Sequence, residues 1–519
     1  MCSLRRFSFS MWKRFIHYRA QPEHKFEWIR PTGHKTNILV YNPITRVKTP
    51  LILRNHNVIT WYMCGPTVYD TSHIGHACTY VRFDIIRRIL SEVFNYNVVY
   101  VMGMTDIDDK IINKSNECGE SCQSITHRYE NEFFADMDSL NVLRPLVTCK
   151  VTNYISEIVA FIEQIFSKNG AYVGKDGSVY FDTCKYLNYG KLKPPQVEGF
   201  DANKKSPLDF ALWKISKQNE PFWESPWGRG RPGWHIECSA IASTILGDNI
   251  DIHSGGIDLS FPHHENEEAQ SCCYHDVDQW VNYWLHTGHL HLEGDTKMSK
   301  SLQNTISISS LLNICTANQF RMLCLLSDYK KNVVFSNDLV EKASTILKKI
   351  EFFLCDCKAY YSGKYEMWDI DASKLLSCLD ETKAQINAAF ANDFNTPKVI
   401  AEILILISTA NKMMKSEKTT TAARSIETVA AVSNYIQSIF AKLGISYLKT
   451  SDMNNNISNI LDTLVEFRRN VRNKSLMANT KDIELLKLCD DVRTKLTSCG
   501  VEIRVKDFIL TIVKNPLGY

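Results

Sequence analysis

Two short motifs in the chain contain residue types that could bind a nucleotide phosphate. The first is His73-Ile74-Gly75-His76, in which two imidazoles are separated by two residues. Imidazole N–H groups donate to phosphate oxygens, and Gly75 lets a flat ligand lie against bare backbone. The second is Lys297-Met298-Ser299-Lys300-Ser301, with two lysines three residues apart. Each pattern alone is common on a solvated surface. The two motifs therefore suggest phosphate binding only if both contribute to one site.

The elements around the first motif would position it. Val58 to Met63 is apolar, β-branched and aromatic, which predicts a buried strand that ends at Cys64-Gly65-Pro66-Thr67. Apolar residues spaced near four predict a helix from about Ile74 to Phe94, and Asn97 to Gly103 is a second strand. This parallel βαβ unit places the motif at a helix N-terminus, which attracts phosphate. The turn lacks GxGxxG, which counts against a dinucleotide-binding unit.

Together the two motifs resemble the signature pair of class I aminoacyl-tRNA synthetases. Four further segments narrow the resemblance: Met63–Asp70 (MCGPTVYD), Thr105–Ile112 (TDIDDKII), Gly233–Ser239 (GWHIECS) and Phe261–Glu267 (FPHHENE). With these segments the chain resembles the cysteinyl-tRNA synthetases, from about Asn37 past Ala343 and more loosely to Arg504.

The resemblance implies an ATP site. In that family the two motifs close on ATP, supplied with Mg²⁺, and stabilise the charge on its α-phosphate as the adenylate forms. By the family pattern the ATP-binding residues are His73, Gly75, His76 and Lys300, and the catalytic residues are His73, His76, Lys297 and Lys300. Positioned cations and N–H donors are well suited to this task.

The resemblance also implies one zinc ion, with ligands at Cys64, Cys238, His263 and Glu267. Thiolate, imidazole and carboxylate are all zinc ligands, and residues four apart, such as His263 and Glu267, share one face of a helix. Their spacing alone would not identify the set, because seventeen cysteines are scattered along the chain and most buried thiols are inert.

The family uses this metal to bind the thiolate of cysteine. Packing discriminates poorly between cysteine and serine. A soft zinc–sulfur bond distinguishes the two amino acids well, so no editing domain is needed. By resemblance the cysteine-binding residues are Gly65, Thr105, Trp234, His253 and His263. For Trp234 the alternative is an ordinary core tryptophan.

Composition is that of a globular protein of two or three domains. The 519 residues are 44% hydrophobic and 23% charged with a net charge of +3, so any RNA-binding surface must be a local patch. The odd number of cysteines without framework spacing favours free thiols in a reducing compartment. No apolar run is long enough to span a membrane.

The predicted fold is α/β: a class I Rossmann-like parallel sheet with an inserted subdomain, followed by an all-α C-terminal tRNA-binding domain. Residues 1–33 are basic, acid-poor and amphipathic, which predicts a mitochondrial transit peptide; a basic arm that holds RNA is the alternative. The catalytic domain is expected at 34–345, with an insertion at about 113–196 and the lysine loop and bridging helices at 297–345. The helical domain is expected at 346–519.

Within these ranges, residues 35–55 are expected to form a hairpin, and 113–165 and 307–335 to be helical. A small strand pair is expected at 170–187. Phe467 to Lys474 is a basic cluster that could hold phosphates or be a solvated helix face. The lysine loop departs from the family at Gln303, where glycine is usual. The segment Phe508 to Val513 is apolar where the family commonly has an acidic one.

The resemblance, together with the predicted transit peptide, implies a mitochondrial-matrix, monomeric cysteine–tRNA ligase acting on cysteine, ATP and tRNA(Cys). The alternatives are an ATP-dependent cysteine–amino-sugar ligase, which lacks the long helical region, and a non-catalytic RNA-binding paralogue, which would be expected to lose part of the site. A zinc hydrolase is excluded because Glu268 stands where HExxH requires its second histidine. Some family members also form cysteine persulfide with pyridoxal phosphate, through lysines of the Lys110 segment and the lysine loop.

Overall fold

The computed structural model describes residues 26–196, 199, 201–292, 305–361, 370–414, 425–445, 455–477, 482–498, 501–503 and 512–514. Most of the predicted transit peptide, the lysine loop with Lys297, Lys300 and Gln303, and most of the segment 508–513 lie outside the described residues.

A five-stranded parallel sheet is the centre of the fold, with the strand order β11-β10-β3-β4-β5. The predicted βαβ unit is confirmed: helix α2 (Ile74–Arg88), continued by a π-helical turn at Ile89–Val93, joins β3 to its neighbour β4. The strands are β3 (Val58–Thr67), β4 (Asn97–Thr105), β5 (Val147–Lys150), β10 (Ile250–Gly256) and β11 (Val281–Thr287).

The sequence predicts that the first strand ends at Met63, before Cys64. In the structure, β3 continues to Thr67. Its pairing with β4 becomes irregular between Cys64 and Thr67, where Pro66 has no N–H to donate. Gly65 fits there because the strands are close: a Cβ at this position would lie 2.1 Å from the backbone oxygen of Gly103. The glycine and proline therefore mark a close, irregular pairing within the strand.

Successive residues of β3 face opposite sides of the sheet and enter different cores. Trp61 and Met63 belong to the core that lies under α2. This core continues among the C-terminal helices. Tyr62 and Cys64 join the core formed with α5 (Ile155–Ser167), α6 (Trp234–Leu246) and α7 (Glu265–His275). Cys64 is thereby directed at helices that begin at Ile155 or later in the chain.

The range 113–165 is mainly helical, as predicted, but residues 140–150 are not: they form a turn, an irregular segment and strand β5. It contains the end of α3 (Asp109–Cys118), all of α4 (Cys122–Ser139) and most of α5. Strand β5 contradicts the prediction because four residues are too few to show a periodicity, and its partner β4 lies far away in the chain. It belongs to the central sheet, although it falls within the range predicted as an insertion; the domain boundaries remain predictions.

A separate antiparallel sheet has the order β6-β7-β8-β9 and begins at Ala171. The predicted small strand pair is confirmed as β6 (Ala171–Val173) and β7 (Val179–Phe181), joined by β8 (Phe210–Ile215) and β9 (Gly230–Pro232). The N-terminal hairpin is also confirmed, as β1 (His34–Asn42) paired with β2 (Val47–Leu53).

The segment 307–335 begins as two helices, α8 (Ile308–Ile314) and α9 (Ala317–Leu325). It ends in a strand that the helical prediction missed, β13 (Val333–Phe335), which pairs in parallel with β12 (Leu290–Leu292). A three-residue strand that depends on a partner forty residues earlier has no local signature.

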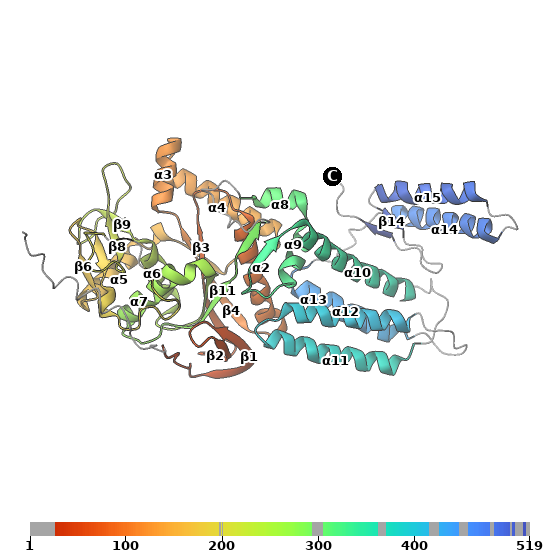
Figure 1. Ribbon diagram of the computed structural model, residues 1–519, viewed down its shortest axis with the longest axis horizontal. Coiled ribbons are helices and arrows are strands. Elements are labelled where there is room, and N and C mark those ends of the chain that lie inside the picture. Colours follow the sequence, from red (N-terminus) through yellow and green to blue (C-terminus); the bar gives the residue numbers. More distant parts are fainter. Residues whose placement is uncertain are drawn as a thin grey trace, which may run out of the picture.

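The C-terminal part is helical, as predicted (Figure 1). Four helices pack together, and a helical hairpin with a short antiparallel strand pair, β14 (Val501–Ile503) and β15 (Ile512–Lys514), follows them. The helices are α10 (Asn337–Tyr361), α11 (Ala372–Ala391), α12 (Thr396–Met413), α13 (Ile426–Lys442), α14 (Asn455–Met477) and α15 (Ile483–Ser498). Across the described part of the chain, no helix has the length and apolar character that spanning a bilayer requires.

Candidate metal and nucleotide site

The four residues predicted to bind zinc come from three elements and meet in one buried cluster. Cys64 lies in β3 and Cys238 lies on α6. His263 lies just before α7, and Glu267 lies within that helix. The Cys64 and Cys238 sulfurs are 3.8 Å apart, and the Cys64 sulfur is 3.5 Å from Glu267 Oε1. His263 Nε2 is 3.0 Å from the same carboxylate oxygen.

The two separations from the Cys64 sulfur suit a tetrahedral metal. Zinc bonds of about 2.0–2.3 Å place neighbouring ligand atoms about 3.3–3.8 Å apart. Burial raises the pKa of the Cys64 thiol and of the Glu267 carboxyl, and it lowers the pKa of His263. Two anions are therefore costly here without a cation between them, while His263 stays in the neutral form that binds metals. The donor set fits zinc.

A second set of donors shares Cys64 and Glu267 and adds His253 and His264. His253 Nε2 lies 2.8 Å from Glu267 Oε2, and His264 Nε2 lies 3.5 Å from the Cys64 sulfur. His264 is in turn held by His286, with 2.9 Å between Nδ1 and Nε2. The sequence analysis missed both His264 and His286; the pair His263-His264 after Phe261-Pro262 was the available signal for the first.

Other residues predicted to bind cysteine surround this cluster. Trp234 is 37% exposed and stacks on His263 with 4.3 Å between ring centres, so it is not a plain core tryptophan. Thr105, at the end of β4, donates to Glu237 over 3.0 Å. His235, which the sequence analysis did not single out, is 2.9 Å from His263 between their Nδ1 atoms. The structure thus brings the predicted pocket residues and the metal donors to the same end of the sheet.

The first signature motif forms the N-terminus of α2. His73 is the N-cap and accepts from the Gly75 N–H over 3.1 Å, while His76 Nδ1 accepts from the His73 N–H over 3.3 Å. The two imidazoles are stacked, with ring centres 3.9 Å apart. This reciprocal capping fixes both rings at a helix end whose dipole favours an anion.

The chain that follows the lysine loop returns to this helix end. The Ile74 N–H donates to the Ile306 carbonyl over 2.9 Å, and the Ile308 N–H donates to the Ser72 carbonyl over 3.3 Å. His73 and Ser307 form an isolated antiparallel bridge. Although Lys297 and Lys300 lie outside the described residues, the segment just after them is thus hydrogen-bonded beside His73 and His76.

Comparison with known families agrees with this arrangement. Residues 51–345 match the model of the tRNA synthetases class I (C) catalytic domain, and residues 385–448 match the DALR domain. The solved methionyl-tRNA synthetase of Mycobacterium tuberculosis in complex with methionyl-adenylate has a similar fold. Its TM-score is 0.56 at 15% identity, and the match covers 75% of this chain and 90% of that one.

Curated relatives are more similar in sequence. A protein of Xenopus tropicalis named "Probable cysteine–tRNA ligase, mitochondrial" is 46% identical over 464 residues, which is 87% of this chain and 81% of the relative. A cysteine–tRNA ligase of Encephalitozoon cuniculi is 41% identical over 472 residues, or 89% of this chain and 96% of the relative. The chain belongs to the cysteine–tRNA ligases, ATP-dependent enzymes of the class I aminoacyl-tRNA synthetases.

Proposed function

We propose that this ligase selects cysteine with a zinc ion held by Cys64, Cys238, His263 and Glu267. The observation that carries the proposal is the convergence of these four side chains, from three elements, into one buried cluster with metal-like separations. When bound, zinc would supply a soft, electron-accepting site for the substrate thiolate.

The remaining pocket residues would then orient the amino acid. Gly65 follows Cys64 in β3 and lets the strand approach Gly103 closely, and Trp234 stacks on His263 at the exposed side of the cluster. Thr105, at the end of β4, and His253, in the middle of β10, complete the predicted pocket. His253 holds the second oxygen of Glu267, so it would fix the orientation of that ligand.

Activation of cysteine requires its carboxylate oxygen to attack the α-phosphorus of ATP. The bond between that phosphorus and the oxygen leading to the β-phosphate breaks, and pyrophosphate leaves with its Mg²⁺. We assign the α-phosphate to the N-terminus of α2, where the His73 and His76 imidazoles would donate N–H groups and Gly75 has no side chain to block a ligand. Lys297 and Lys300 would balance the charge that develops on the phosphates.

The test of this proposal is amino-acid-dependent ATP–pyrophosphate exchange with metal-assayed protein. Exchange with cysteine but not serine, lost on chelation and restored by Zn²⁺, is the expected result. Equal exchange with metal-free protein would refute a selecting role for zinc. A matched charging assay with tRNA(Cys) measures the second step, transfer of the cysteinyl group to the terminal adenosine.

The C-terminal helices are proposed to bind the tRNA beyond its acceptor end, which the match to the DALR domain supports. It also disfavours the amino-sugar ligase, which lacks such a region. Not all of the predicted basic cluster is available for phosphate. Arg468 is buried and donates to the Cys489 carbonyl over 2.6 Å, and Arg472 pairs with Asp490 over 3.0 Å, so both hold α15. Lys474, at the end of the cluster, is exposed and is the better candidate for an RNA contact.

A role in mitochondrial translation is proposed from the basic, acid-poor residues 1–33 and supported by the relative named as mitochondrial. A fluorescent reporter fused after residue 33 should enter the matrix, and replacing the five basic residues before Glu23 should leave it outside. We also propose that the enzyme is a monomer of 59.5 kDa, which light scattering at working concentration would test.

Persulfide formation from cysteine with pyridoxal phosphate is a further proposal, which rests on the family resemblance. Of its lysines, Lys110 is described and lies 5.6 Å from the centre of the Tyr69 ring. Persulfide production that depends on added pyridoxal phosphate would support this activity. A lack of persulfide from protein active in cysteine exchange would end it.

A further inference from the structure

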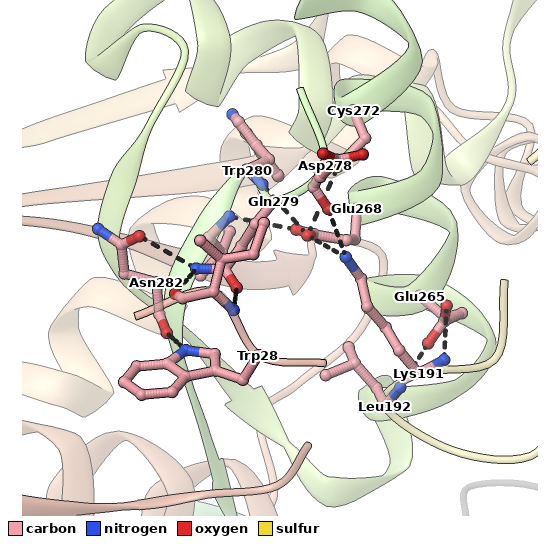
Figure 2. Close-up of polar contacts among 12 residues, drawn as sticks. Trp28, Lys191, Leu192, Glu265, Glu268, Cys272, Asp278, Gln279, Trp280 and Asn282 are labelled. Carbon is pink, nitrogen blue, oxygen red and sulfur yellow. Dashed lines mark hydrogen bonds and ion pairs between the residues drawn. The ribbon is translucent and has the colours of Figure 1, made fainter. Parts of the chain in front are cut away.

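A loop of residues Tyr189 to Leu192 lies against the start of α7, the helix that carries Glu267 (Figure 2). The Glu265 carboxylate accepts three backbone N–H groups from this loop: Gly190 over 2.7 Å, Lys191 over 3.1 Å and Leu192 over 2.8 Å. Such a set of N–H donors holds a carboxylate in one orientation.

The Lys191 side chain makes the second attachment. Its ammonium donates to Glu268 Oε1 over 2.7 Å and to the Asp278 carbonyl over 3.2 Å, with only 5% of the lysine side chain and none of the glutamate side chain exposed. Glu268 also accepts the N–H groups of Trp280 and Val281, each over 3.2 Å. Lys191 and Glu268 together therefore connect α7 to the segment that leads into β11 (Figure 2).

A third contact comes from Tyr189, whose hydroxyl donates to Asn266 Oδ1 over 2.5 Å. The loop thus holds three residues that surround Glu267 in sequence. Because successive helical residues turn by about 100°, Glu265 and Glu268 share a face, and Glu267 points away from it. Fixing the first two from behind fixes the direction in which the Glu267 carboxylate leaves the helix.

The direction of the Glu267 carboxylate matters because it makes short contacts on the face of α7 opposite to the loop. This carboxylate is 3.0 Å from His263 Nε2, 3.5 Å from the Cys64 sulfur and 2.8 Å from His253 Nε2. A small rotation of α7 would move one oxygen out of reach of this cluster, and supporting contacts of this kind typically change metal affinity by about 10–100-fold.

We propose that Lys191, with its loop, is a positioning residue that orients Glu267 and thereby sets the affinity for zinc and the preference for a thiol substrate. This inference rests on the proposed zinc site. It assigns a role in amino-acid selection to the chain between β7 and β8, which contributes none of the four predicted metal ligands.

The experiment compares Lys191→Met with Lys168→Met. Lys168 is a matched control because its ammonium also bonds to α7, at the Tyr274 carbonyl over 2.8 Å, but beyond the metal end of the helix. For each full-length protein one measures zinc release to a chelator, the visible spectrum of the Co²⁺-substituted form, and the KM values for cysteine and ATP in exchange.

Lys191→Met is expected to weaken zinc binding by about 10-fold or more, alter the Co²⁺ bands, and raise the KM for cysteine while leaving that for ATP unchanged. Lys168→Met should match the wild type. A folded Lys191→Met protein with wild-type zinc release and Co²⁺ bands would overturn the proposal. So would equal changes in both variants.

Because Lys191→Met leaves Glu268 as an unpaired buried charge, the double variant Lys191→Met/Glu268→Gln guards against simple unfolding. It removes both charges and should fold, yet keep the zinc defect; normal zinc binding in it would also overturn the proposal. Wild-type protein that binds no zinc would instead refute the proposed metal site itself, so the two failures are distinguishable.

Discussion

The guanidinium of Arg321 lies 2.6 Å from the carboxylate of Asp84, and each side chain is 1% exposed. Asp84 belongs to α2, whose first turn carries the histidine motif, and Arg321 belongs to α9, which follows the lysine loop. Arg321 also donates to the carbonyls of Asn141, over 2.7 Å, and Leu443, over 3.3 Å. One buried ion pair therefore joins the signature helix to the end of the helical bundle.

Replacing Arg321 by methionine should destabilise the protein strongly. The change leaves Asp84 buried beside Arg88 alone and leaves the carbonyls without their donor, and breaking a buried pair in this way typically costs about 3–5 kcal/mol. Chemical denaturation followed at several wavelengths would measure the loss. The exposed pair Lys383–Asp380 provides the control, since Lys383→Met should cost less than about 1 kcal/mol. Similar midpoints for the two variants would contradict the prediction.

Cys238→Ser should weaken zinc binding and cysteine selectivity together, because a hydroxyl is a poorer zinc ligand than a thiolate. Metal analysis after dialysis should show less than one zinc per chain, and the cysteine-to-serine ratio of kcat/KM should fall. Cys149→Ser is the control: that thiol is buried on β5 and is not in either donor set. Full zinc occupancy in Cys238→Ser would remove Cys238 from the ligands.

Lys300→Ala should slow adenylate formation by about two or more orders of magnitude, because the variant would lose the cation proposed to stabilise the transition state. Pyrophosphate exchange at saturating cysteine and ATP measures this step directly. Thermal stability and zinc content should match the wild type. Exchange within a few-fold of normal would exclude Lys300 from the chemistry.

Asp136→Asn should make stability less dependent on pH. Burial, together with the charge of Glu132, raises the pKa of Asp136 to about 6, and its Oδ2 has no hydrogen-bond partner among the described residues. Since the unfolded value is about 3.9, the folded protein holds this proton more tightly. The carboxyl therefore costs nothing below about pH 4, and its penalty grows as the pH rises through about 6.

Relative to wild type, Asp136→Asn should thus gain Tm between pH 4.5 and pH 7.5. The gain should be about 1–2 °C, corresponding to about 1 kcal/mol after allowance for partial solvent screening. Glu132→Gln removes the neighbouring charge and should give a smaller gain with the same sign. A difference between Asp136→Asn and wild type that does not change with pH would contradict the assigned pKa.

The sequence by itself determined the elements whose residue pattern is local. Period-four apolar spacing marked α2, and β-branched runs marked β3 and β4. The motif resemblance supplied the four metal donors, which the structure brings together. Assignment of Lys297 and Lys300 to ATP remains a prediction, because these lysines lie outside the described residues.

Only the tertiary structure decided what depends on partners distant in sequence. Strands β5 and β13 are too short to have a period of their own and exist through pairing with β4 and β12. The chain beyond Cys64 stays in β3 because Gly65 tolerates the approach of Gly103. The contact of His264 with the cluster and of Lys191 with α7 likewise depends on packing, since most buried polar groups are hydrogen-bonded to partners that the fold brings near.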